Sequence, residues 1–499
     1  MELFDNLALG LATAASWQNV LFCLTGVVIG TLVGVLPGIS PLTTIAMLLP
    51  FTFGLPPESA IIMLAGIFYG AQYGSSTAAI LVNVPGETSS IVTCIDGYQM
   101  ARQGRAGPAL AMAAVSSFFA GTIATLVIAV MSLPLAALAL KFTAVETVSL
   151  VILGLLGAVV LAHGSPAKAI AMIIVGILVG LVGVDVNSGT PRMTFGIPDI
   201  TDGISFVPIA IGLFGIAEMI RNLEQPPEAN VPHMRISRVM PTWADCKAAF
   251  PAMTRGTAVG CVLGVLPGGG AALPPFSAYA LEKKLAADPS RFGKGAIEGV
   301  AAPEAANNAG AQTSFVPMLT LGLPTNPLMA LMIGALMIQG IQPGPQVMIK
   351  QPELFWGVIA SMWIGNLMLI IINLPLIGIW VSLLRVPYNL LFPVIVVFCA
   401  IGAYSINSSL FDLWLMLGFG LLGYFFLKIG VEPAPFVLGF VLGPMLEESF
   451  RRAMLINSGD LMIFLQRPIS AFLLACSVVL LAVLLIPGVR RKRELLQET

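Results

Sequence analysis

Long apolar runs are the feature that most constrains this chain. A bilayer offers the backbone no hydrogen-bond partners, so a chain that crosses it is usually helical. A helix needs about 20 mostly apolar residues to cross the hydrocarbon core. Runs that qualify cover roughly 107–133, 145–162, 166–184, 203–220, 354–380, 390–406, 411–428 and 470–487. Only 10% of the 499 residues are charged and 57% are hydrophobic. The sequence therefore predicts an all-α polytopic membrane protein.

Charge and motif content exclude several other classes of protein. The net charge is −1 and the basic residues stand in short loops, which argues against a nucleic-acid partner. The six cysteines have no CxxC spacing, so neither a disulfide framework nor a zinc site is expected. RFGKGA lacks the Ser or Thr that a P-loop needs after Lys294. We expect no enzyme activity and no cofactor. We also expect no signal peptide, because no Lys or Arg precedes the first apolar run.

Four further apolar regions are interrupted by Pro, Gly and polar residues. They cover 17–55, 58–95, 254–282 and 296–340. In hydrocarbon such an interruption is tolerated only where protein buries it or where it lines a wet cavity. These regions are therefore predicted to form broken or re-entrant helical hairpins around a cavity.

The interrupted regions also repeat. GVVIGTLVGVLPG at 26–38 matches GTAVGCVLGVLPG at 256–268, and GAQ occurs at 70–72 and at 310–312. A duplicated unit of this length indicates an internal repeat. We expect a first transmembrane repeat at 1–222, a cytoplasmic linker at 223–253, a second repeat at 254–468, and a C-terminal transmembrane helix with a basic tail at 469–499.

Charge also suggests how the two repeats are oriented. An acidic N-terminus outside and a basic linker inside require an odd number of crossings, so the second repeat is expected to be inverted. For this, 254–282 must dip into the membrane and return to the same side. Arg451, Arg452 and Arg467 would then face outward, against the positive-inside rule.

The interruptions predict a site for an anion. Half-helices that end at membrane depth direct unpaired N–H groups and the positive end of the helix dipole at a ligand. The glycines of GxxxGxxxG, which precede each Pro-Gly, are assigned to helix packing instead. The residues expected to bind substrate are Gly38, Ser40, Thr43, Thr44, Ser75, Ser76, Thr77, Asn83, Pro85, Gly86, Thr88, Ser89, Gly268, Gly269, Gly270, Asn307, Asn308, Gln312, Thr313, Ser314, Pro324, Thr325 and Asn326.

Acidic residues in apolar surroundings are candidates for ion coupling. Glu87 follows a Pro-Gly, and Glu304 lies in AAPEAANNAG. Either is expected to bind H⁺ or Na⁺, and a Na⁺ site is possible at the hairpin tips, with unidentified ligands. Glu218 and Glu298 are interpreted as interfacial or helix-end residues, and His163 as a structural residue of a turn.

Long stretches resemble one family. They are AGIFYGAQYGSSTAAILVNVPGETSSIVTCIDGYQMARQGRAGPAL (65–110), SGTPRMTFGIPDITDG (188–203), RFGKGAIEGVAAPEAANNAGAQTSFVPMLTLGLPTNP (291–327) and PAPFVLGFVLGPMLEESFRR (433–452). These are similar to the large membrane subunit, the TctA type, of tripartite tricarboxylate transporters. The resemblance implies a multi-pass protein of the bacterial inner membrane that imports carboxylates such as citrate, driven by an ion gradient. It also implies a small membrane subunit and a periplasmic solute-binding protein as partners.

Two alternatives remain open from the residues alone. A single-component carboxylate permease would use the same site without a binding protein. A membrane subunit of a gradient-coupled decarboxylase would also place acids in the membrane. Hydroxyl and backbone amide groups suit several carboxylates, so the sequence does not identify the substrate.

Overall fold

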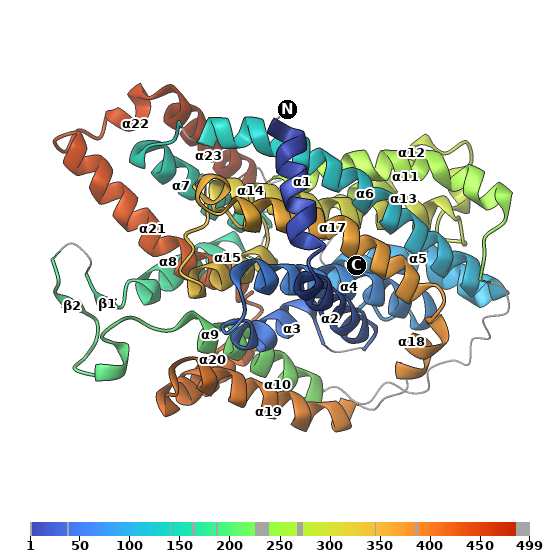
Figure 1. Ribbon diagram of the computed structural model, residues 1–499, viewed down its shortest axis with the longest axis horizontal. Coiled ribbons are helices and arrows are strands. Elements are labelled where there is room, and N and C mark those ends of the chain that lie inside the picture. Colours follow the sequence, from blue (N-terminus) through green and yellow to red (C-terminus); the bar gives the residue numbers. More distant parts are fainter. Residues whose placement is uncertain are drawn as a thin grey trace.

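A computed structural model describes residues 2–36, 39–139, 141–161, 165–185, 188–224, 239–266, 273–344, 346–384 and 388–485. These residues are almost entirely helical (Figure 1). The only strands among them, β1 (Gly183–Val184) and β2 (Pro191–Arg192), pair antiparallel. Within the described residues, five helices are long and apolar enough to cross a membrane. The prediction of an all-α polytopic membrane protein is confirmed at this level.

The helices follow one another without a separate soluble domain in the described part of the chain. Up to Glu224 they are α1 (Glu2–Ala14), α2 (Trp17–Val35), α3 (Pro41–Leu48), η1 (Leu49–Thr52), α4 (Pro57–Val82), η2 (Thr88–Ser90), α5 (Ile91–Met100), η3 (Ala101–Arg105), α6 (Ala106–Ala139), α7 (Ala144–Leu161), α8 (Pro166–Gly180), η4 (Pro198–Ile200), α9 (Phe206–Ala210), η5 (Ile211–Ile216) and α10 (Ala217–Glu224). From Trp243 they are α11 (Trp243–Gly264), α12 (Leu273–Leu285), η6 (Pro289–Arg291), α13 (Glu298–Thr313), α14 (Phe315–Leu321), α15 (Pro327–Ile338), α16 (Val347–Lys350), α17 (Pro352–Asn373), α18 (Ile377–Leu383), α19 (Tyr388–Asn407), α20 (Leu410–Lys428), α21 (Ala434–Ile456), α22 (Ile463–Gln466) and α23 (Pro468–Leu485).

Two helix pairs are packed through glycine. Gly26, Gly30 and Gly34 on α2 face backbone carbonyls of α4, less than 3.0 Å from where a Cβ atom would lie. Gly256 and Gly260 on α11 face backbone carbonyls of α13 in the same way. Any side chain at these positions would separate the helices, because the contact is between backbones. The packing role predicted for these glycines is confirmed.

The helices are interrupted inside the predicted regions. α2 ends at Val35 and α3 begins at Pro41. α4 ends at Asn83 and α14 ends at Gly322, both in the left-handed conformation with φ of 60° and 69°. The two Pro-Gly tips, with Gly38, Gly268, Gly269 and Gly270, lie outside the described residues, as does His163.

Some helix bounds differ from the ranges predicted for the segments. The run at 354–380 is not one span: α17 ends at Asn373 and α18 starts at Ile377, because Pro375 between them cannot continue a helix. α11 begins at Trp243, inside the segment assigned to the linker. The N-terminal residues form α1, whose Gly10 lies against the backbone of Trp356.

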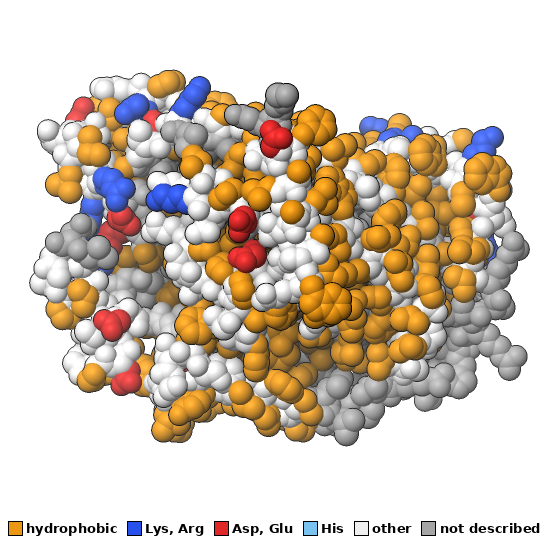
Figure 2. All heavy atoms as spheres, viewed as in Figure 1, with side chains coloured by type: hydrophobic (Ala, Val, Ile, Leu, Met, Phe, Trp, Pro, Cys, Tyr) orange, Lys and Arg blue, Asp and Glu red, His pale blue; other side chains and the backbone are white. Residues whose placement is uncertain are grey.

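The outer surface is apolar. Leu126, Val130 and Leu178 are about half exposed, although such side chains are normally buried in water-soluble proteins. In Figure 2 hydrophobic side chains cover much of the visible face, the Lys and Arg side chains lie mostly toward its left side and its top, and a few acidic side chains lie near its middle. A continuous apolar surface of this kind fits contact with lipid.

Candidate functional site

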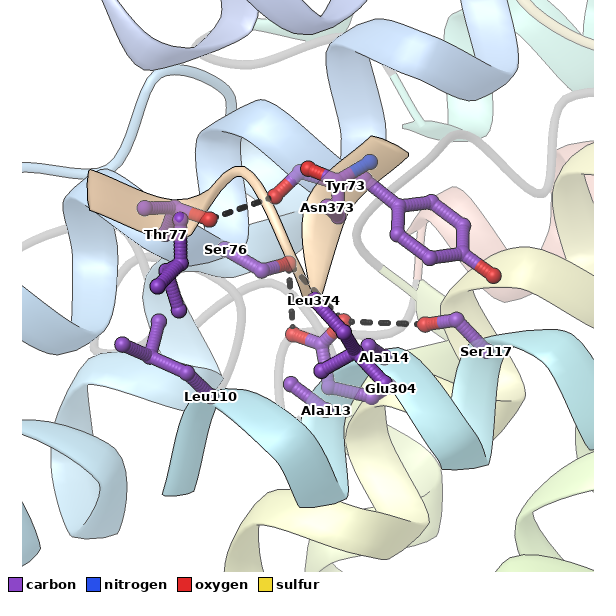
Figure 3. A pocket seen from close by; sticks show the side chains of 11 residues that line it. Tyr73, Ser76, Thr77, Leu110, Ala113, Ala114, Ser117, Glu304, Asn373 and Leu374 are labelled. Carbon is purple, nitrogen blue, oxygen red and sulfur yellow. Dashed lines mark hydrogen bonds between the residues drawn. The ribbon is translucent and has the colours of Figure 1, made fainter. Parts of the chain in front are cut away.

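A carboxylate at the centre of the molecule is held by hydroxyl groups from three other helices. Glu304 lies on α13 and is only 1% exposed. Ser76 Oγ of α4 lies 2.8 Å from both of its oxygens and donates its one proton between them, and Thr93 of α5 donates to Oε1 at 2.5 Å. Ser117 of α6 donates to Oε2 at 3.4 Å, and Figure 3 shows Ser76 and Ser117 on two sides of the carboxylate. We call Glu304, Ser76, Thr93 and Ser117 the Glu304 cluster.

A small cavity adjoins this cluster. Its volume is about 20 Å³, and Glu304 is the only charged residue that lines it among the described residues. The lining also includes Tyr73, Thr77 and Asn373. A space of this size holds about one water molecule, whereas pockets for small organic ligands are typically about 300–1,000 Å³. The cavity as described therefore suits a cation or a water molecule, and a carboxylate substrate requires the helices to separate.

Two carboxamides next to the cluster have no partner. Gln72 on α4 and Asn307 on α13 are buried, and within the described residues neither their amide nitrogens nor their amide oxygens make a hydrogen bond. Both line a second cavity of about 10 Å³, together with Asn326. Native proteins pair nearly all buried polar groups, so groups left open mark a place for a ligand or water. A carboxamide offers two N–H donors to a carboxylate.

The carboxamides and the Glu304 cluster share helix faces. Gln72 and Ser76 are four residues apart on α4, while Glu304 and Asn307 are three residues apart on α13. Side chains at these spacings are neighbours on a helix surface. Asn307 thus lies one turn away from the buried acid on α13, and Gln72 lies one turn away from Ser76, a hydroxyl partner of that acid, on α4.

Ser40 and Thr43 contact the carboxylate of Glu218 and not the Glu304 cluster. Both donate to Oε2 of Glu218, Ser40 at 2.8 Å. Glu218 lies inside the continuous helix Phe206–Glu224, and its carboxylate faces α3. The helix continues past Glu218 to Glu224, so Glu218 is not a helix-end residue, and its interpretation as an interfacial residue stays a prediction. Glu298 does begin α13, where it pairs with Arg291 at 3.2 Å.

The remaining predicted residues have structural contacts or none. Asn308 donates to Ser117 Oγ at 2.6 Å and so helps to hold Ser117 in place beside Glu304. Hydroxyls that donate back to their own helix backbone are those of Thr44, Thr77, Thr313 and Ser314. Gln312 accepts from Thr125 through Oε1, and Thr325 has no partner in the described part of the chain.

Glu87 is part of the break after α4, and its contacts are not with the Glu304 cluster. Its backbone N–H donates to Ser75 Oγ at 2.9 Å, and its carboxylate accepts from Ser89. Gly86 lies against the carbonyl oxygen of Gly34, 2.8 Å from where a Cβ would stand. Asn83 and Thr88 are exposed, Pro85 is half-buried and Pro324 is buried. In the described part of the chain none of these four residues makes a hydrogen bond with the Glu304 cluster.

Sequence reasoning missed four residues of this centre. They are Gln72, Tyr73, Thr93 and Ser117. Gln72 had a signal, because GAQ is repeated at 310–312. Thr93 and Ser117 had none, because their link to Glu304 is a contact between distant parts of the chain.

Comparison with known proteins agrees with this arrangement. A model of the tripartite tricarboxylate transporter TctA family matches residues 20–438. An uncharacterized 52.8 kDa protein of the TAR-I ttuC′ 3′ region of Agrobacterium vitis is 56% identical over 497 residues, which is 99% of this chain and 98% of that relative. An uncharacterized protein of the TAR-II ttuC′ 3′ region of the same organism is 57% identical over 235 residues, 47% of this chain and 97% of that relative.

No solved structure shows a significant match. The family match covers most of the chain, and the described helices include several that are able to cross a membrane. Members of this family are transporter components that work with other subunits in a tripartite system. The chain is a multi-pass membrane protein that belongs to the tripartite tricarboxylate transporter TctA family.

Proposed function

We propose that this chain is the membrane subunit of an ion-gradient-driven importer of carboxylate anions. Its substrate is a tricarboxylate such as citrate or a related carboxylate. A periplasmic binding protein delivers that substrate, and a small membrane subunit completes the assembly in a bacterial inner membrane. The family membership supports the class of transporter.

One observation carries the proposal for this chain. The unpaired carboxamide of Asn307 stands one helix turn from the buried carboxylate of Glu304, and that of Gln72 stands one turn from Ser76, which contacts the same carboxylate. Carboxamide N–H groups suit a substrate carboxylate, whereas a carboxylate surrounded by hydroxyls suits H⁺ or Na⁺. An anion and a cation placed this close attract each other, since the interior has a low effective dielectric constant. Binding of one then favours binding of the other, which is the basis of symport.

The two glycine-packed pairs supply the moving parts. We propose that α2–α4 and α11–α13 are equivalent parts of two inverted repeats, because both pairs use the same GxxxGxxxG contact. Gln72 belongs to one pair and Asn307 to the other. The space between them is about 10 Å³, so substrate entry requires one pair to move away from the other. Movement of this kind is alternating access.

Uptake of labelled carboxylates into proteoliposomes tests the proposal. The purified chain, with its two partner subunits, is assayed across a carboxylate panel while Na⁺ and pH are varied. The wild type is expected to accumulate at least one carboxylate in response to an imposed Na⁺ or H⁺ gradient. Glu304→Gln, which removes the charge and keeps the shape, is expected to lower uptake at least about 100-fold, as expected for a buried charge that the transport cycle uses.

Glu298→Gln is the matched control for this variant. It lies on the same helix, and its partner Arg291 is more than half exposed, so the pair contributes little. Its uptake should equal that of the wild type. Gradient-independent uptake, or full activity of Glu304→Gln at normal expression, would contradict the proposal. Substrate consumption without a gradient would favour the decarboxylase alternative, and uptake without the binding protein would favour a single-component permease.

A further inference from the structure

A second group of oxygens surrounds a carboxylate far along the chain from Glu304. Ser40 caps the start of α3, directly after the first chain break, and Thr43 follows within the first turn. Glu218 lies on α10, next to the π-helical segment η5. The cluster also includes the backbone carbonyl of Phe214, which belongs to η5. π-helical segments are rare and occur frequently at functional sites.

The four oxygens are close together. Ser40 Oγ lies 2.8 Å from Glu218 Oε2, and Thr43 Oγ1 contacts the same Oε2. Thr43 Oγ1 is also 2.9 Å from Phe214 O. The two hydroxyl oxygens lie 2.9 Å apart. Thr43 is 2% exposed, so water has little access to its hydroxyl.

The number of protons does not match the number of contacts. A hydroxyl has one proton to donate, while a carbonyl oxygen and an ionised carboxylate have none. Ser40 and Thr43 thus provide two protons for the four oxygen–oxygen contacts. When Glu218 is ionised, two of the contacts bring oxygens together without a proton between them. Positive charge within the group relieves that mismatch: a proton on Glu218 leaves one contact without a proton, and a metal cation between the oxygens removes the mismatch altogether.

Among the described residues no Lys or Arg makes a hydrogen bond or an ion pair with the group, and Arg221 acts on Glu218 only from a greater distance. α3 and η5 contain no charged residue, and neither does α19, which packs against both. Arg221 is one turn further along the Glu218 helix and is exposed. α20 packs against α10, but its Lys428 pairs with Glu224 at 2.6 Å.

We propose that Ser40, Thr43, Glu218 and the Phe214 carbonyl bind a monovalent cation, a proton or a sodium ion, at a site separate from Glu304. The donor set consists only of oxygen, from two hydroxyls, one carboxylate and one backbone carbonyl, and oxygen ligands of this kind suit hard cations. The Glu304 cluster comes from α4, α5, α6 and α13, so the two sites share no residue. The role of this cation in driving uptake rests on the proposed function, but its binding does not.

Direct cation binding to the purified full chain, without substrate, tests this site. Labelled sodium binding is measured by equilibrium titration, and the infrared band of a protonated carboxyl group is followed as pH is varied. If sodium is the ligand, Glu218→Gln should weaken sodium binding at least about tenfold, because a charged ligand is lost. Thr43→Val keeps the shape and removes one oxygen, and should weaken it about threefold or more.

Thr257→Val is the control, because the buried Thr257 hydroxyl donates only to Met253 O of its own helix among the described residues. It should leave both readouts unchanged. If the wild type does not bind sodium, the site takes a proton. Glu218→Gln should then remove one titrating carboxyl band from the infrared spectrum, and Thr43→Val should shift that band. Wild-type sodium binding together with an unchanged infrared titration in both variants would overturn the proposal. Thr43→Val provides the test if Glu218→Gln is not monodisperse.

The two proposals fail in different ways. Loss of carboxylate uptake in the wild type, with cation binding at Glu218 intact, would refute the importer function and leave this site standing. Gradient-driven uptake in Glu218→Gln with wild-type cation dependence would show that the site does not contribute to transport coupling.

Discussion

The α2–α4 pair and the α11–α13 pair have the same backbone contacts but different polar chemistry. Both pairs rely on glycine against backbone carbonyls. Beyond them, α4 and α14 each end in a left-handed residue, Asn83 or Gly322, and four residues later stands an extended residue, Glu87 or Asn326. The extended residues have nearly the same dihedral angles, −148° and 163° against −151° and 168°.

The side chains at these matched positions differ. Asn326 accepts from the Met329 N–H and caps α15, whereas Glu87 accepts from Ser89 Oγ. On the helices, α4 contributes the hydroxyl of Ser76 and α13 contributes the carboxylate that receives it. The two helix pairs thus have the same backbone geometry but supply different groups to one centre, a hydroxyl donor from α4 and a carboxylate acceptor from α13.

The packing glycines give the sharpest test of the shared geometry. Gly30→Ala and Gly260→Ala each place a methyl group against a backbone carbonyl that has no room to move. We expect each to lower the stability of the folded protein by about 1–3 kcal/mol or more, and by similar amounts in the two halves. Thermal unfolding in detergent measures this. Gly418→Ala is the control, because it lies in helix α20 with nothing within 4 Å. A large effect in only one half would show that the pairs are not equivalent.

The two left-handed residues, Asn83 and Gly322, are expected to differ in how much an alanine costs in stability. Gly322→Ala has to adopt φ of +69° and brings a Cβ 2.7 Å from Pro343 O, so it should cost about 2 kcal/mol or more. Asn83 already has a Cβ at φ of 60°, and Asn83→Ala should cost only about 1 kcal/mol, the left-handed preference of Asn. Unfolding midpoints of the two variants give the difference. Equal losses would indicate that the Pro343 contact has no effect.

An ion pair also joins the two halves of the chain, and its removal is expected to change the stability least. Arg105, just before α6, contacts Asp245 of α11 at 2.6 Å. Burial raises the pKa of Asp245, but hydrogen bonds from Thr242 and Arg105 and the charge of Arg105 outweigh it, so this pKa lies below its ordinary value. The stabilisation is complete above the unfolded pKa of about 3.9 and is lost as pH falls through the lowered value.

Arg105→Gln should therefore destabilise the protein by less than about 1 kcal/mol near neutral pH, since the arginine is partly exposed. The difference from the wild type should shrink below about pH 4. Unfolding midpoints of both proteins between neutral and acid pH check this. A difference that grows on acidification would contradict the assigned partner.

Features with a local signal were predicted from the sequence. The apolar runs gave most of the helices, and the GxxxGxxxG spacing gave the packing of α2 and α11. The break at Pro375 had a local signal too, but it stands inside an apolar run that reads as one span. The breaks near Asn83 and Gly322 were also predicted, from proline and glycine in apolar surroundings.

Contacts between distant segments were not predicted. The ring of hydroxyls around Glu304 joins residues 76, 93 and 117 to residue 304, and no periodic pattern encodes those distances. For the same reason Ser40 and Thr43 were assigned to substrate, although their contacts are to Glu218. Residue type indicated polar chemistry at the breaks, but tertiary packing decides which groups meet.

Binding of labelled carboxylate to the purified chain tests most directly whether the two halves share one site. The substrate identified by uptake is titrated against the wild type, Gln72→Leu, Asn307→Leu and the double variant, with Thr320→Val, a buried and locally bonded threonine, as control. We expect each single variant to lose about tenfold in affinity, and the double variant to lose less than the product, because both carboxamides hold one anion. Wild-type affinity in both single variants would contradict the account.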